Sequence, residues 1–307
     1  MKKVLSLLLC LILLLSLSAC GDGYKTDKKA KAEDIFPVAM QNLSATLKNL
    51  LTPEAESTQL KYTLSGNASA SLDLPIPSTD GGSSSKVQIN GKLNGSGEAD
   101  NKKGLSLTLN AETDALKALG PILGGMMDSS SSEDLKIELG LYVDQEAHRL
   151  YQKTMDDEQW SYSEFTTLAQ ESNLKELDKL NTVTLDQVFE KYEFTINKEE
   201  YVFEGTANVS ALSGIGTDAS GLPVDPKTVS QAMEMLKGLK PAVKIVVNAD
   251  KKITSLQLKI QDFTVDLGAM MPLSAVIKEL SLDFGIQYEN VNFSVPANVK
   301  TEAEAAH

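Results

Sequence analysis

The chain has 307 residues, 29 of them basic and 42 acidic, and its formal net charge is −13 at pH 7. This length allows one large or two small domains with a substantial core. Arg149 is the only arginine. Such an acidic surface repels the phosphates of nucleic acid, and a single arginine provides almost no guanidinium groups to bind them. We therefore expect no nucleic-acid partner.

The first residues have the layout of a secretory signal. Lys2 and Lys3 supply positive charge, and an apolar run from Val4 to Leu17 follows them. This run is too short to cross the roughly 30 Å of a bilayer core, and small residues close it, as in a cleavable leader. Residues 1–19 are therefore predicted to be a signal peptide.

The signal ends in a motif around a cysteine. Leu17, Ser18, Ala19 and Cys20 resemble a bacterial lipobox, in which a branched aliphatic residue and two small residues precede the cysteine. The resemblance implies that the Cys20 thiol receives a diacylglyceryl group and that cleavage makes Cys20 the new N-terminus. Two or three acyl chains give stable anchoring. The implied location is the outer, extracytoplasmic face of the cell membrane. The alternative is an ordinary signal peptide that contains a cysteine.

A disulfide is the other common use of a cysteine in an exported protein. Cys10 lies inside the predicted signal, so the mature chain has no second cysteine to pair with Cys20. Removal of the signal leaves 288 residues with 27 basic and 42 acidic side chains, a net charge of about −15. We interpret Cys20 as a lipid-attachment site, with no role as a catalyst or metal ligand.

The polar, lysine-rich residues 20–33 are predicted to be the lipidated cysteine and a flexible tether. A helix is expected over 34–51, where apolar residues recur at helical spacing. Further helices are expected over the following ranges: 113–126, 166–178, 184–192, where Thr184 and Gln187 fit a capping box, and 225–237. A turn or short helix is expected near 272–279.

Strictly alternating segments separate these helices. In DLKIELGLYV, residues 134–143, apolar residues from Leu135 to Val143 alternate with polar or small ones, and residues 58–73 alternate similarly. Such alternation indicates antiparallel strands with one apolar and one solvated face. Glycine and alanine on the apolar face favour strong curvature. The predicted fold class is α+β: a strongly curved, half-barrel-like antiparallel sheet with helices on its concave face.

We assign residues 34–298 to this domain, with its last strand stopped by Pro296, and residues 299–307 to a disordered tail. An internal similarity relates YTLSGNASAS at 62–71 to YVFEGTANVS at 201–210. The domain could therefore consist of two similar halves, about 34–165 and 193–298, although chance or a shared need for glycine in curved strands explains the similarity equally well.

A family resemblance rests on two segments. Leu150-Tyr151-Gln152-Lys153 followed by Trp160-Ser161, and the ending YENVNFSVPANV, are similar to a hairpin and a closing strand of the LolA/LppX-type carriers and related lipoproteins of Gram-positive bacteria. The resemblance implies a half-barrel with a helical lid that holds the acyl chains of lipids or lipoproteins. Long Ser/Gly loops and extra helical segments depart from that pattern.

An apolar cavity under the helices is one consequence of such a fold, and a filled core is the other. Candidate lining residues, chosen as apolar strand residues and as flexible thioethers beside a predicted helix, are Leu107, Leu139, Trp160, Met233 and Met235. Core packing remains the alternative for each of them. No metal site and no cofactor are expected.

An enzyme is not expected. The only histidines are His148 and His307, and the chain contains no nucleophile elbow, phosphate loop or dinucleotide fingerprint. Three interpretations remain: a carrier of an apolar or lipid ligand, a surface interaction or sensor lipoprotein with a filled core, and a transporter substrate-binding lipoprotein. The last would require parallel strands between helices, which the alternation disfavours.

Overall fold

The structure, a computed structural model, describes the following residues: 26–76, 83–123, 134–153, 159–167, 171–209, 239–266 and 274–306. Several sequence predictions lie outside these ranges, namely the signal peptide, the lipobox, the attachment site Cys20, the candidate lining residues Met233 and Met235, and the helix expected over 225–237.

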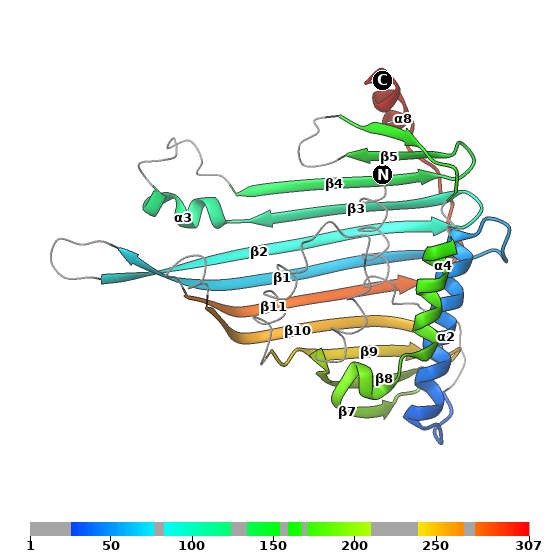
Figure 1. The fold of residues 1–307 in the computed structure, drawn as a ribbon, viewed down its shortest axis with the longest axis horizontal. Coiled ribbons are helices and arrows are strands. Elements are labelled where there is room, and N and C mark those ends of the chain that lie inside the picture. The colour runs from blue at the N-terminus through cyan, green and yellow to red at the C-terminus, as the bar shows by residue number, and fades with distance from the viewer. Residues whose placement is uncertain are drawn as a thin grey trace.

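One antiparallel sheet of eleven strands organises the described residues, in the order β6-β5-β4-β3-β2-β1-β11-β10-β9-β8-β7 (Figure 1). The strands in chain order are β1 Gln59–Ile76, β2 Ser83–Asp100, β3 Gly104–Thr113, β4 Leu135–Asp144, β5 Arg149–Lys153, β6 Ser161–Glu164, β7 Phe189–Ile196, β8 Glu200–Ala207, β9 Ala242–Asn248, β10 Ile253–Asp266 and β11 Ser274–Gln287. β6 and β7 are its edges, so the sheet is not closed. The predicted antiparallel sheet is confirmed, and the parallel sheet of a transporter substrate-binding protein is not what these strands form.

The helices are α2 Ala32–Leu51, α3 Ala115–Leu123, α4 Glu171–Asp178, the 3-10 helix η1 Lys179–Thr182, α5 Leu185–Val188 and α8 Ala297–Ala305. The helix predicted over 34–51 is confirmed as α2. The two similar segments, 62–71 and 201–210, occupy different positions in the sheet. The first lies on β1 in the middle of the sheet, and the second starts on β8, next to the edge strand β7.

Two helix predictions were wrong in part. The helix expected over 184–192 begins as predicted, with Gln187 Oε1 accepting a hydrogen bond of 2.9 Å from Thr184 N, but it ends at Val188. From Phe189 onward the chain is a strand, because Tyr192 and Phe194 alternate with charged residues and pack onto the core. Likewise, the expected turn or helix near 272–279 is already strand β11 from Ser274.

The sheet has one apolar and one polar face. Residues opposite each other on neighbouring strands share a face, and the register pairs Leu64 with Phe284 on β11 and with Gly95 on β2. The other face is lined with charged pairs, such as Lys61 with Glu289 at 2.8 Å. These exposed pairs contribute little stability individually but keep that face hydrated.

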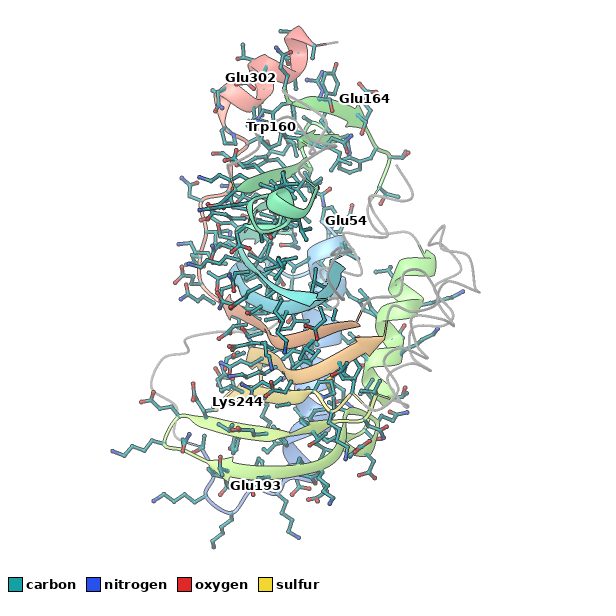
Figure 2. All side chains as sticks on the ribbon, turned by 90° about the vertical axis from the view of Figure 1, so that its left-hand side faces the viewer. Glu54, Trp160, Glu164, Glu193, Lys244 and Glu302 are labelled. Carbon is teal, nitrogen blue, oxygen red and sulfur yellow. The ribbon has the colours of Figure 1, made fainter. Side chains whose placement is uncertain are left out.

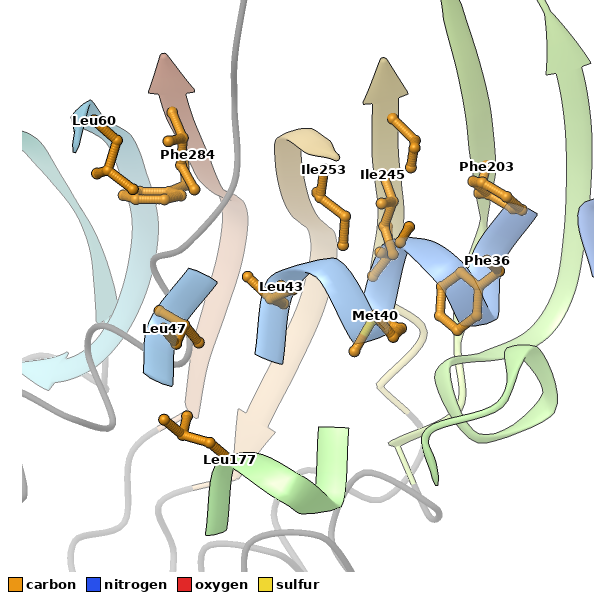
Figure 3. Close-up of a cluster of buried hydrophobic side chains, with 14 of the residues drawn as sticks. Phe36, Met40, Leu43, Leu47, Leu60, Leu177, Phe203, Ile245, Ile253 and Phe284 are labelled. Atoms are coloured by element: carbon orange, nitrogen blue, oxygen red, sulfur yellow. The ribbon is translucent and has the colours of Figure 1, made fainter. Parts of the chain in front are cut away.

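α2 covers one end of the apolar face, where β1, β11, β10, β9 and β8 lie side by side beneath it (Figure 3). Phe36 meets Phe203 edge to face, with ring centroids 5.5 Å apart, and both side chains are fully buried. On the other side of α2, Ser44 Oγ donates a 2.8 Å hydrogen bond to the carbonyl of Leu177 in α4. α2 is therefore sandwiched between the sheet and α4.

The C-terminal segment forms a second, smaller cluster. Beyond Gln287 the chain leaves the sheet, runs without ladder pairing to Pro296, and enters α8. Val299 and Ala303, four residues apart on α8, are buried together with the following residues: Tyr151, Val291, Phe293 and Val295. The predicted disordered tail over 299–307 and the predicted last strand up to Pro296 were therefore wrong, because this segment has its own apolar stripe to bury.

The predicted tether is also shorter than expected. Thr26 is buried, its backbone N–H donates to the carbonyl of Lys198 at 3.2 Å, and the N–H of Asp27 donates to the Tyr201 hydroxyl at 2.9 Å. Residues 26–31 are thus attached to the β7–β8 hairpin, and α2 begins at Ala32.

Candidate ligand-holding face

Burial on the apolar face declines along the strands with distance from α2. On β1, Leu60 and Leu64 are buried beneath α2, whereas Ala68 is exposed. On β3, Leu105 and Leu107 are buried and Leu109 is half-buried. The same strands therefore pass from a filled core into a more open section of the apolar face.

Glycines on this face mostly give no free space. A Cβ on Gly97 would overlap the ring of Tyr62, and one on Gly95 would overlap the Leu109 side chain. A Cβ on Gly66 would lie 2.8 Å from Leu282 Cδ2. At these positions the neighbouring side chains fold over the bare backbone, so glycine serves close packing there and leaves no cavity.

Gly91 differs from them. A Cβ at this position would have its nearest neighbours at 3.5 Å, the carbonyl of Glu112, and at 3.9 Å, the Cβ atoms of Ala68 and Thr113. These are ordinary van der Waals distances. Gly91 and the small residues next to it on the same face form what we call the small-residue section, which consists of Ala68, Ala70, Gly91, Ala111 and Thr113.

Half-buried aliphatic side chains border the small-residue section. Leu93 and Leu109 lie on the section's own strands β2 and β3, Ile137 and Leu139 lie on β4, Leu280 and Leu282 lie on β11, and Leu258 lies on β10 beyond β11. Burial increases again further along the strands, at Val87 and Ala275, each 9% exposed. The section is therefore an apolar area with small residues at its centre, between two better-buried parts of the same sheet face.

Two of the predicted lining residues lie near this section. Leu107 is 7% exposed and belongs to the core beside it. Leu139 stands opposite Leu109 in the register of β3 and β4 and is half-buried at the border. Both therefore lie on the apolar face, but only Leu139 borders its open part.

Trp160 lies on the opposite face of the sheet. Its ring centroid is 5.4 Å from that of Tyr142, and its indole covers Gly140, where a Cβ would overlap it. Trp160 packs against the C-terminal cluster, and Figure 2 shows it at the same end of the molecule as Glu302 and Glu164. It does not share a lining with Leu107 and Leu139.

Sequence reasoning missed the small-residue section itself. Its signal was present, because Ala68 and Ala70 alternate on β1 and Gly91 belongs to β2. However, the same signal occurs at Gly95 and Gly97, where neighbouring side chains fill the space. Only the cross-strand register distinguishes the two cases.

The described residues hold no group of three or more His, Cys, Asp or Glu side chains that could bind a metal ion. His148, with a φ of 52°, sits in the exposed turn between β4 and β5 and packs its ring on Phe165. Burial raises the pKa of the Tyr62 hydroxyl, which donates a hydrogen bond to the carbonyl of Ser106. That tyrosine is a packing residue. Within the described ranges, no helix has the length and apolarity needed to cross a membrane.

The comparisons with known proteins identify no family for the chain. No protein-family model and no curated protein matches it. Among solved structures, a β-barrel-like protein from Brucella abortus with a domain of unknown function is 10% identical, with a TM-score of 0.20, over 72% of this chain and 98% of that one. The outer membrane protein OprG from Pseudomonas aeruginosa is 6% identical, with a TM-score of 0.09, over 76% of this chain and 97% of that one.

Proposed function

We propose that this protein is a membrane-anchored, extracytoplasmic lipoprotein that holds an apolar ligand, such as the acyl chain of a lipid, against the small-residue section. In this proposal the sheet is a half-barrel of the LolA/LppX type, α2 and α4 lie on its concave face, and the diacylglyceryl group on Cys20 is the anchor. The protein holds its ligand without chemistry and is not an enzyme.

The observation that carries the proposal is the contrast between two glycines of β2. At Gly97 a neighbouring ring occupies the space above the backbone, whereas a Cβ on Gly91 would make only ordinary van der Waals contacts. A close-packed core leaves few such places. An area of small residues bordered by leucines is a surface that an acyl chain fits, since it offers dispersion contacts and its one hydroxyl, that of Thr113, already donates to the carbonyl of Asn90 at 3.0 Å.

The proposal is tested by native mass spectrometry of the mature chain, combined with organic extraction of the same sample. We expect a reproducible excess mass that is extracted as a lipid, beyond the acyl groups attached to Cys20. A bare protein mass that does not change after incubation with membrane lipids contradicts the carrier function.

The second candidate is a surface interaction or sensor lipoprotein with a filled core. It is favoured by the two buried clusters and by Gly95 and Gly97, whose neighbours fill the space above them. Both candidates have the same lipid anchor, location and fold. They differ only in whether a lipid is bound, which the mass measurement detects.

A further inference from the structure

The folded body begins close to the predicted anchor. Thr26 is 8% exposed, and its N–H and its hydroxyl both donate hydrogen bonds to carbonyls of the β7–β8 turn, those of Lys198 and Asn197. The N–H of Asp27 adds a bond to the buried Tyr201. Residues 26–31, which we call the anchor turn, are thus fixed to one edge of the sheet.

Only six peptide units separate Cys20 from Thr26. A fully extended chain spans at most about 3.3–3.6 Å per residue, so this stretch reaches no further than about 20 Å. If Cys20 carries the lipid, as the proposed function states, Thr26 lies within about this distance of the bilayer surface, and the β7–β8 turn to which it is hydrogen-bonded lies beside it.

The anchor turn carries positive charge in an otherwise acidic protein. Lys28, Lys29 and Lys31 are all exposed, and the one carboxylate among these residues, Asp27, accepts a 2.9 Å hydrogen bond from the N–H of Lys29. Lysines next to a membrane anchor are attracted to anionic headgroups, whereas surfaces rich in carboxylates are repelled. The neighbouring carboxylates of Glu199, Glu200 and, in the first turn of α2, Glu33 and Asp34 are also exposed and weaken this attraction.

We propose that the anchor turn is a contact surface for the anionic lipid bilayer, and that it holds the sheet with β7 toward the membrane and β6 away from it. This inference rests on the lipid anchor of the proposed function. Figure 1 shows β7 and the first turn of α2 at one end of the molecule, and β6 with α8 at the other. Charge attraction at the anchor turn and repulsion elsewhere select this orientation over the others that the short connection permits.

The orientation determines how far the ligand-holding face stands from the membrane. β2 is separated from β7 by six strand spacings in the sheet order. At about 4.8 Å per spacing, the small-residue section lies about 29 Å from β7 along the sheet, and β6 lies about 48 Å away. A lipid would therefore leave the bilayer completely before reaching the section.

Spin labels at the two edges test the orientation. The full lipidated chain has no free thiol once Cys20 is acylated, so the variants Glu193→Cys on β7 and Glu302→Cys on α8 each take a single label. These positions appear at opposite ends of Figure 2. The chain is reconstituted in vesicles of phosphatidylglycerol and phosphatidylcholine that contain a nickel-chelating lipid, which accelerates relaxation of nearby labels.

We expect relaxation to be several-fold stronger at residue 193 than at residue 302. In the triple variant Lys28→Gln, Lys29→Gln, Lys31→Gln the preference for the docked orientation falls on the order of 100-fold, from the attraction of an anionic surface for each lysine. The control variant Lys92→Gln, Lys117→Gln, Lys136→Gln has the same change of charge elsewhere on the surface and should retain the difference.

The outcomes separate the inference from the proposed function. Acyl mass on Cys20 with equal relaxation at both labels overturns the orientation and leaves the anchor intact. A difference that is the same in the triple variant, or in vesicles in which phosphatidylcholine replaces the phosphatidylglycerol, overturns the lysine contact. Absence of acyl mass on Cys20 overturns the anchor and the inference together, because the short connection is counted from that residue.

Discussion

The ring of Tyr62 occupies the place that a side chain on Gly97 would take. The two residues stand opposite each other on β1 and β2, and the Tyr62 hydroxyl reaches on to the carbonyl of Ser106 on β3. One aromatic side chain thus crosses over two neighbouring strands. This is possible only because β2 has no side chain at residue 97, so glycine and tyrosine act as one packing unit.

The first prediction concerns this unit. Gly97→Ala should destabilise the fold by about 1–3 kcal/mol, because the new methyl group would overlap both the Ser106 carbonyl oxygen and the Tyr62 ring. Gly91→Ala is the matched control on the same strand. Its methyl group has room, so it should be neutral or slightly stabilising through the reduced freedom of the unfolded chain. Chemical denaturation of both variants measures the difference, and equal stabilities would contradict the contrast on which the ligand-holding face is based.

The second prediction concerns the ion pair that fastens α8. Lys300 Nζ lies 2.8 Å from Asp144 Oδ2. Burial alone would raise the pKa of the Asp144 carboxyl, but the hydrogen bonds from Lys300 and from the N–H of Ala147 outweigh it, and the pKa lies below its usual 3.8. The hydrogen bond to Asp144 in turn raises the pKa of Lys300 above its usual 10.5.

The signs follow from these directions. A carboxyl whose pKa is lowered by folding adds stability above its unfolded pKa, and this is lost as the pH falls through the folded value. A lysine whose pKa is raised adds stability that is lost only at strongly alkaline pH. Lys300→Met should therefore destabilise the fold by about 1–2 kcal/mol at pH 7 and by much less below the lowered pKa of Asp144. Denaturation curves at the two pH values measure this, and a pH-independent loss would mean that packing rather than charge is removed.

The third prediction tests α8 as part of the fold. Val299 is 2% exposed in the C-terminal cluster, whereas Thr301 on the same helix is exposed. Val299→Asp places a carboxylate in an apolar site and should destabilise the cluster by several kcal/mol, roughly 2–4, while Thr301→Asp should change little. Trp160, the only tryptophan, packs against this cluster. A red shift of its fluorescence in the Val299 variant alone is the expected readout, and an unchanged spectrum would mean that α8 does not cover the cluster.

The sequence predicts well which segments form strands. It predicts poorly which side chains pack over each face of the sheet. Alternation identifies the apolar face of β3 and β4 without any structure, because one face is solvated and the pattern is strict. β5 breaks this rule. Leu150 and Tyr151 are both buried, one on each face, because the C-terminal segment covers the polar face there. Alternation therefore cannot decide which face the residues next to β5 occupy. For this reason the sequence prediction places Trp160 with Leu107 and Leu139, which lie on the opposite face of the sheet.

The ends of the chain were misjudged for a similar reason. Val299 and Ala303 are spaced by four residues among good helix formers, which is the pattern of a short amphipathic helix. Its partner is Tyr151, about 150 residues away along the chain. In the same way, the attachment of Thr26 depends on carbonyls of the β7–β8 turn that local sequence does not reveal.

The last prediction tests the ligand-holding face directly. Ala68→Phe places a ring into the small-residue section, where Ala68 is exposed and Gly91 leaves space. Because residue 68 is exposed, the variant should fold with a stability close to that of the parent chain, and it should retain much less of the extractable lipid. Asn67→Phe is the control: it adds the same ring to the adjacent residue, which faces the polar side of the sheet and is exposed. Native mass spectrometry of the two variants beside the parent chain measures the retained lipid. Equal retention in Ala68→Phe and the parent would place the ligand elsewhere on the protein, whereas loss in Asn67→Phe as well would mean that the sheet as a whole, and not this section, responds to the added ring.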